Sequence, residues 1–230
     1  MFRQLIIGKR RQILVDVNTQ RDFFLADGKV CIRNHKRVLS HIRRIMAWAR
    51  TKNIPIISVC EVYPNHNGGN YCVDGTSGQK KVSYTLISRR ISFPADGHTD
   101  LPVDILRNYK QVILHKRCVD PFEEPRIERL LTDAKASEFI LIGATAEGAV
   151  EATALGLLQQ GKKVCIITDA VGTHNSREGD LAFRKMKAKG AKLLETRKIA
   201  GTSHLHLVGA CDCKRCSGSL SKTRLHLSTS

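Results

Sequence analysis

The chain has 230 residues, 42% hydrophobic and 26% charged, which is the composition of an ordinary folded protein and excludes disordered, collagen-like and membrane classes. Its 38 Lys and Arg against 21 Asp and Glu give a formal net charge of +17, which favours anionic partners without naming one. The first residues contain too short an apolar stretch for a signal peptide, and no run approaches the roughly 18 apolar residues of a membrane helix. We therefore expect a cytoplasmic protein that does not associate with membranes.

Short β-branched runs alternate along the chain with stretches of helical periodicity. Buried strands are predicted at residues 13–15, 56–60, 112–114, 139–142 and 164–167. Apolar side chains repeat at helical spacing over residues 38–49, 146–158 and 181–188. The alternation predicts an α/β fold of three layers, doubly wound, with a mostly parallel sheet between two layers of helices.

The periodic pattern defines one domain over residues 1–200. Residues 63–99 are rich in Gly, Asn, Ser and Thr and are expected to form loops over the site. Residues 201–230 form a basic C-terminal tail containing Cys and His. Four of its side chains offer enough soft ligands for one structural zinc, the alternative being a flexible tail with incidental thiols. They are His204, Cys211, Cys213 and Cys216.

The positive charge is spread over several short clusters, among them Lys80-Lys81, Arg89-Arg90 and Lys162-Lys163. Charge clusters of this kind normally form solvated faces. Nucleic acid is a partner that the charge allows, but no motif supports it and few aromatic residues are present to stack bases.

In a doubly wound sheet the functional site forms beyond the carboxyl ends of the strands. Polar or small residues follow each predicted strand and are the candidates for chemistry. They are Asp16, Glu61, Lys116, Gly143-Ala144-Thr145 and Asp169.

Four segments of the chain resemble the isochorismatase-like cysteine hydrolases, in the family's order and spacing. They are Ile13 to Phe24 with Asp27-Gly28, Cys72 to Gly78, Val112 to Arg117 with Phe122, and Gly143 to Ala154 closed by Thr168-Asp169-Ala170. The resemblance covers residues 11 to 199. It implies the family's Rossmann-like fold with a six-stranded sheet, a small-molecule substrate and a homo-oligomer.

The resemblance also implies roles for individual residues. Asp16 stands at the place of the general acid or base, Lys116 at that of a neighbouring lysine, and Ala149 at that of the nucleophilic cysteine. A cysteine there would open a helix, whose dipole and the lysine would stabilise its thiolate. Backbone N–H groups of Thr145 and Ala149 would hold the oxyanion of a tetrahedral intermediate, and the peptide bond before Thr145 tends to be cis in the family.

Three further residues, Phe23, Glu61 and Cys118, are expected to border the substrate. Some relatives bind a metal through an Asp-x-His arrangement, but this chain has Glu61-Val62-Tyr63 there, so no family-style metal or other cofactor is expected at the hydrolase site.

A methyl group cannot attack a carbonyl carbon, so Ala149 excludes the covalent cysteine route. Three hypotheses remain. The chain is a hydrolase of a small anionic metabolite that works without the cysteine, with Asp16 as acid and Lys116 holding a carboxylate. Alternatively, it is a pseudoenzyme with a binding, regulatory or scaffold role toward a polyanion or a partner protein. In the third, Cys118 is a displaced nucleophile, sharing the face of Lys116 if the strand continues.

Overall fold

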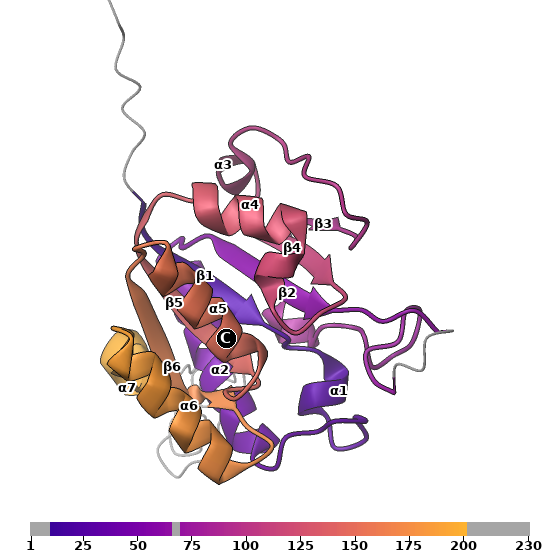
Figure 1. Ribbon diagram of the computed structural model, residues 1–230, viewed down its shortest axis with the longest axis vertical. Helices are drawn as coiled ribbons and strands as arrows, with labels where there is room; N and C mark the ends of the chain where they lie inside the picture. Colours follow the sequence, from indigo (N-terminus) through magenta and orange to yellow (C-terminus); the bar gives the residue numbers. More distant parts are fainter. Residues whose placement is uncertain (1–9, 66–69, 202–230) are drawn as a thin grey trace, which may run out of the picture.

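The computed structural model describes residues 10–65 and 70–201, and its centre is a parallel sheet (Figure 1). The sheet has seven strands in the order β3-β4-β2-β1-β5-β6-β7, and all of its strand pairs are parallel. The strands are β1 (Arg10–Val17), β2 (Ile56–Glu61), β3 (Arg90–Phe93), β4 (Gln111–Lys116), β5 (Ala136–Ala144), β6 (Val164–Gly172) and β7 (Lys192–Leu194).

The predicted α/β class is confirmed, but the prediction of six strands is one short. The two edge strands, β3 and β7, are three or four residues long and only partly buried. Such strands lack the continuous apolar run by which the central strands of a parallel sheet are recognised in a sequence. The segment 63–99, predicted as loops, therefore also contains a strand.

Helices cover both faces of the sheet. They are α1 (Arg21–Phe24), α2 (His35–Thr51), α3 (Ile105–Asn108), α4 (Pro125–Asp133), α5 (Ala149–Gln159), α6 (Ser176–Ala188) and α7 (Thr196–Ala200), with 3₁₀ turns at Ser83–Thr85 and Pro121–Glu123. One hydrophobic cluster packs α4, α5 and α6 against the sheet, and a second packs α2 against the other side. Figure 1 shows α4, α5 and α6 in front of the sheet and α2 behind it. We call these sides the α5 face and the α2 face.

Alternation along β1 assigns each of its side chains to one face. Ile13, Val15 and Val17 belong to the cluster on the α5 face, whereas Leu14 belongs to the cluster on the α2 face. Because successive side chains of a strand point to opposite faces, Asp16 shares the α2 face with Leu14. The face on which Asp16 lies determines which groups this predicted acid can reach.

Helix α2 shows how the sequence determines the second layer. Its buried residues Val38, Ile42, Ile45, Met46 and Ala49 recur at helical spacing and form one apolar stripe. The helix ends in a Schellman motif, in which the N–H of residue 54 donates to the carbonyl of residue 49 (2.8 Å) and that of residue 53 to residue 50 (3.1 Å). Residue 53 is an asparagine with φ of 54°, a left-handed conformation that asparagine tolerates.

No helix within the described parts of the chain combines the length and apolar character needed to cross a bilayer.

Candidate functional site

A cavity of about 190 Å³ opens at the carboxyl edge of the sheet, beside the first residue of α5. Ten residues line it, contributed by α1, by the end of β2, by the first residue of α5 and by the connections that follow β1, α1, β2, β4, β5 and β6. They are Asn18, Phe23, Val30, Glu61, Tyr71, Val119, Thr145, Gly148, Ala149 and His174. The structure thus brings together four of the residues predicted from the sequence: Phe23, Glu61, Thr145 and Ala149.

The turn from β5 into α5 is built as the family resemblance implied. The peptide bond between Ala144 and Thr145 is cis, and Ala149 is the first residue of α5. The first amides of a helix lack intrahelical acceptors, so the Ala149 N–H is one that a bound group can use. Ala149 itself is 2% exposed, and its methyl group contributes to the wall of the cavity.

Glu61 is the centre of a buried polar cluster beside the cavity. Its Oε1 accepts hydrogen bonds from Asn18 Nδ2 (2.7 Å) and from the Lys116 ammonium (2.9 Å), and its Oε2 accepts one from the Tyr63 hydroxyl (3.2 Å). The Gln20 side chain pairs with both the N–H (2.8 Å) and the carbonyl (2.6 Å) of Glu61. The carboxylate is therefore held in place by three donors.

Lys116 lies at the end of β4, and its side chain is completely buried. An ammonium group has three N–H donors. Besides the bond to Glu61, Lys116 Nζ donates to the carbonyls of Cys118 (2.5 Å) and Val119 (3.0 Å). All three donors are thus used within the protein, and Lys116 is not among the residues that line the cavity.

Asp16 occupies the opposite side of the sheet from Ala149. It is completely buried on the α2 face, where its Oδ2 accepts hydrogen bonds from Lys81 Nζ (2.6 Å) and Ser58 Oγ (3.0 Å). Its Oδ1 has no partner among the described residues. The structure therefore does not bring Asp16 to the cavity where the family resemblance placed the general acid or base.

The partner of Asp16, Lys81, was missed at the sequence level. Lys80 is exposed as predicted, but the side chain of Lys81 is 5% exposed and donates to both Asp16 and Thr19 Oγ1 (2.6 Å). Burial alone would lower the pKa of Lys81, but the adjacent Asp16 carboxylate raises it above its usual value. The solvated-face prediction for this cluster is wrong for Lys81, because the loop after β2 folds across the end of β1.

Asn18 is the second residue that sequence reasoning missed. It follows β1 with φ of 50°, a left-handed conformation that asparagine tolerates better than most residues. Its Nδ2 donates to Glu61, whereas its buried Oδ1 has no partner in the described residues. The signal available in the sequence was an Asn directly after the predicted strand, a position favoured for tight backbone turns.

Cys118 lies outside the cavity, although the sequence predicted that it borders the substrate. Strand β4 ends at Lys116, so the condition for a shared face is not met. The half-buried thiol donates to the carbonyl of Asp120 (3.0 Å), and burial raises its pKa to about 11. A thiol in this state is a poor nucleophile near neutral pH.

The described residues contain no group of three or more His, Cys, Asp or Glu placed to hold a metal ion. At the place of the relatives' metal ligands, Glu61 is occupied by three donors and Tyr63 is a phenol, and burial raises the pKa of that phenol far above its ordinary value. These residues do not fit a metal centre. The predicted tail ligands His204, Cys211, Cys213 and Cys216 lie outside the described residues.

A three-layer parallel α/β domain with a cavity at the first turn of α5 defines an isochorismatase-like protein. Residues 12–198 match the family model of the Isochorismatase domain, and the chain belongs to that family.

A curated relative and several solved structures are similar to the chain. The N-carbamoylsarcosine amidase of Arthrobacter sp. is 25% identical over 138 residues, which is 59% of this chain and about half (49%) of that protein. The pyrazinamidase of Pyrococcus horikoshii, solved in complex with zinc, superposes with a TM-score of 0.63 at 22% identity, covering 80% of this chain and 99% of the other. The N-carbamoylsarcosine amidase of Thermoplasma acidophilum superposes with a TM-score of 0.62 at 17% identity, covering 81% of this chain and 96% of the other. These structures share the fold of this chain.

Proposed function

We propose that this isochorismatase-family chain is a pseudoenzyme that binds a small molecule in the cavity without hydrolysing it. The observation that carries the proposal is the Ala149 methyl in the cavity wall, at the position where the family resemblance places a cysteine. None of the residues lining the cavity carries a thiol, and covalent acyl transfer of the family type needs one.

The positions of the three charged residues that the sequence proposed for chemistry support the same conclusion. Hydrolysis without the cysteine would require an acid that can reach the substrate. Asp16 points to the α2 face and pairs with Lys81, and the Glu61 carboxylate already accepts three hydrogen bonds. Lys116 has no donor left for a substrate carboxylate.

The cavity also indicates which chemistry it would bind. Phe23 stacks on His174 with ring centroids 6.4 Å apart and meets Tyr71 edge-on at 5.7 Å, so part of the wall is aromatic. Asn18 Oδ1, which lacks a partner among the residues that the structure describes, is a hydrogen-bond acceptor beside Glu61 and favours a ligand with an N–H or O–H donor. This differs from the anion expected from the sequence, because Glu61 neutralises the Lys116 charge. At about 190 Å³ the cavity is smaller than the roughly 300–1,000 Å³ of typical drug-sized sites.

Hydrolysis and binding assays on the full-length protein test the proposal. The relatives' names supply N-carbamoylsarcosine and pyrazinamide as compounds with amide donors, and isochorismate serves as the acid-labile alternative. We expect neither ammonia nor pyruvate to be released, and we expect calorimetric binding of at least one amide. Ala149→Leu, which fills the cavity, should abolish that binding, whereas Ala152→Leu, one turn further along α5 and outside the cavity, should retain it.

Turnover would contradict the proposal. The decisive result is ammonia or pyruvate release that co-purifies with the protein and disappears in the Ala149→Leu variant, because contaminating hydrolases would be unaffected by that substitution.

A further inference from the structure

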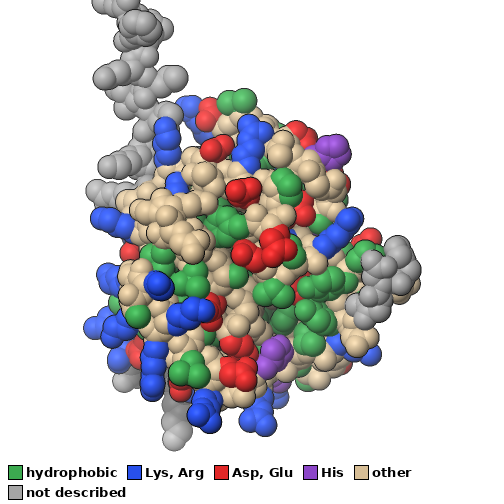
Figure 2. All heavy atoms as spheres, in the orientation of Figure 1, with side chains coloured by type: hydrophobic (Ala, Val, Ile, Leu, Met, Phe, Trp, Pro, Cys, Tyr) green, Lys and Arg blue, Asp and Glu red, His purple; other side chains and the backbone are tan. Residues whose placement is uncertain are grey.

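Many Lys and Arg residues from different parts of the chain lie at the amino-terminal edge of the sheet, opposite the cavity. Because all strand pairs are parallel, every strand begins at this edge, and the connections that enter the strands meet there. We call the cations in or beside these connections the basic edge. They are Lys52, Arg89, Arg90, Arg107, Lys110, Lys135, Lys162, Lys163, Lys189 and Lys192. In Figure 2, Lys and Arg side chains are frequent along the left side, where Figure 1 shows α7 as well as the starts of central strands.

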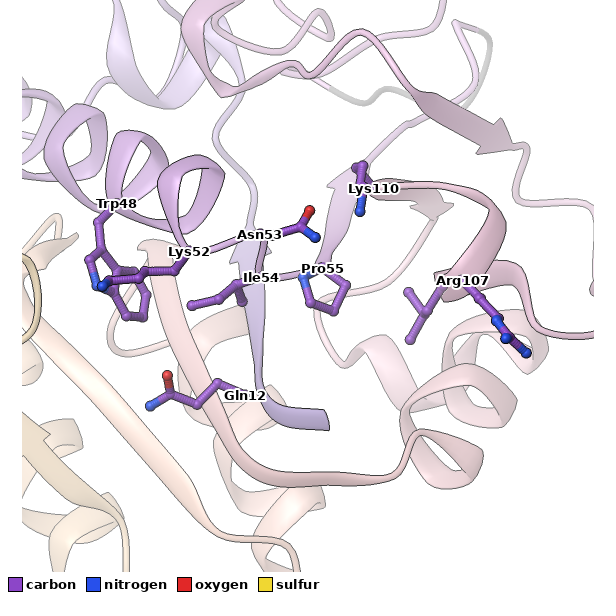
Figure 3. Close-up of a pocket in the computed structure, with 9 residues that line it drawn as sticks. Gln12, Trp48, Lys52, Asn53, Ile54, Pro55, Arg107 and Lys110 are labelled. Carbon is purple, nitrogen blue, oxygen red and sulfur yellow. The ribbon is translucent and has the colours of Figure 1, made fainter. Parts of the chain in front are cut away.

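A groove of about 680 Å³ lies within the basic edge, between the C-terminal ends of α2 and α3 and the start of β1 and β4. Figure 3 shows Trp48 at one side and Ile54 and Pro55 at its centre. The other lining residues are Gln12, Lys52, Asn53, Leu106, Arg107 and Lys110. Trp48 is the single tryptophan of the chain and is half-buried, so part of its indole faces the groove.

The three cations of the groove are not neutralised by the protein. In the part of the chain that the structure describes, Lys52, Arg107 and Lys110 form no ion pair. One carboxylate, that of Glu138, lies beside the groove residue Gln12 and accepts from its Nε2 (2.9 Å), so the three cations of the groove outnumber it. The edge therefore has an uncompensated positive potential that attracts polyanions.

We propose that the basic edge binds a single-stranded nucleic acid, with a base on Trp48 and phosphates on Lys52, Arg107 and Lys110. Non-specific binders of single strands combine a cationic groove with an aromatic side chain that stacks bases. Here the indole and the cations line one groove. Seven strands at a spacing of about 4.8 Å extend the edge over about 29 Å, which accommodates several nucleotides.

The simpler explanation for these cations is a structural one. Lys52 and Arg107 lie at helix C-termini, where positive charge complements the helix dipole. That role requires neither a groove nor a tryptophan, and it predicts stability effects without any effect on binding. The two explanations can be separated by measuring both quantities.

The test titrates the full-length protein with oligothymidylate and oligouridylate of about 12 nucleotides, within the site sizes of such proteins. We expect quenching of Trp48 fluorescence and an affinity that falls as salt rises. In a Lys52→Gln/Arg107→Gln/Lys110→Gln variant, the log–log salt slope should become shallower by about 2, since each phosphate contact contributes about 0.7. Trp48→Leu, followed by anisotropy of a labelled strand, should weaken binding about tenfold.

The matched control removes the same charge from the opposite edge. Lys29, Arg33 and Arg177 are exposed near the carboxyl ends of β1 and β6, and their triple Gln variant should bind almost as well as the wild type. Equal losses in both triple variants would overturn the proposal, because net charge alone would then explain binding. Binding that leaves Trp48 fluorescence unchanged, or equally strong binding of polyglutamate, would also overturn it. Thermal melts of each variant confirm that it folds.

Discussion

Replacing Lys81 with Met tests the buried ion pair on the α2 face. Asp16 is completely buried, and its Oδ2 receives hydrogen bonds only from Lys81 and Ser58 among the described residues, while its Oδ1 receives none. Removing the ammonium leaves a buried carboxylate with one neutral hydroxyl donor. Loss of one partner of a buried pair costs about 3–5 kcal/mol, so the free energy of unfolding should fall by that amount.

Urea unfolding followed by circular dichroism measures the effect as a lower midpoint at an unchanged m-value. The matched control is Lys80→Met at the exposed neighbouring position, which should change stability by less than about 0.5 kcal/mol. The Asp16→Asn/Lys81→Met double variant should recover much of the loss, because it removes the uncompensated charge. The reasoning is refuted if Lys81→Met unfolds within about 1 kcal/mol of the wild type, since Asp16 would then not depend on Lys81.

Three further predictions concern the backbone conformation of Gly143, the reactivity of the Cys118 thiol and the pH dependence of stability. Gly143 has φ of 125°, and a Cβ there would collide with the carbonyl oxygen of Val17, so Gly143→Ala should cost at least about 3 kcal/mol in urea unfolding. Gly161→Ala, with φ of 71° and open space around it, should cost only about 1–2 kcal/mol. Because burial raises the Cys118 pKa to about 11, iodoacetamide should alkylate it about a hundredfold more slowly than a free thiol at pH 8, and a mass-spectrometric rate within tenfold of the free thiol would contradict this. Burial lowers the pKa of His115, so the unfolded chain takes up a proton at a higher pH than the folded protein does. The stability that the neutral imidazole contributes should be fully present above about pH 6.5 and should be lost as the pH falls below that value. His115→Gln should flatten this pH dependence in thermal melts recorded at several pH values.

Much of the fold and part of the site followed from sequence because both depend on local patterns. The apolar runs of β1, β2, β4, β5 and β6 identify buried parallel strands, and the residues after them must meet at one edge. Glu61 and Thr145 were found in this way, whereas Ala149 was found from the family resemblance. The short strands β3 and β7 were missed because a half-buried edge strand has no comparable pattern.

The face on which Asp16 lies was not predicted, although the alternation of β1 contains that information. Leu14 and Asp16 share one face and Val15 and Val17 the other, but the sequence alone does not tell which face carries α5. The pairing with Lys81 depends on how a long connection folds back across the sheet, and no periodicity encodes such a contact.

The basic edge illustrates the same limit at the level of the whole molecule. Arg89-Arg90 and Lys162-Lys163 are more than 70 positions apart in the sequence and look like separate solvated clusters. Parallel topology brings the connections that carry them to one end of the sheet, so their common location is a property of the fold.

The hydrogen bonds of Lys116 affect how variants of this protein should be interpreted. Its ammonium donates to Glu61 in β2 and to the carbonyls of Cys118 and Val119 in the connection after β4, and these hydrogen bonds link the two segments. A variant without this lysine loses the hydrogen bonds that join two segments lining the cavity, those of Glu61 and Val119. A Lys116 variant that no longer binds a ligand would therefore report a collapsed site, and its loss of binding should not be counted as evidence that the lysine contacts the ligand.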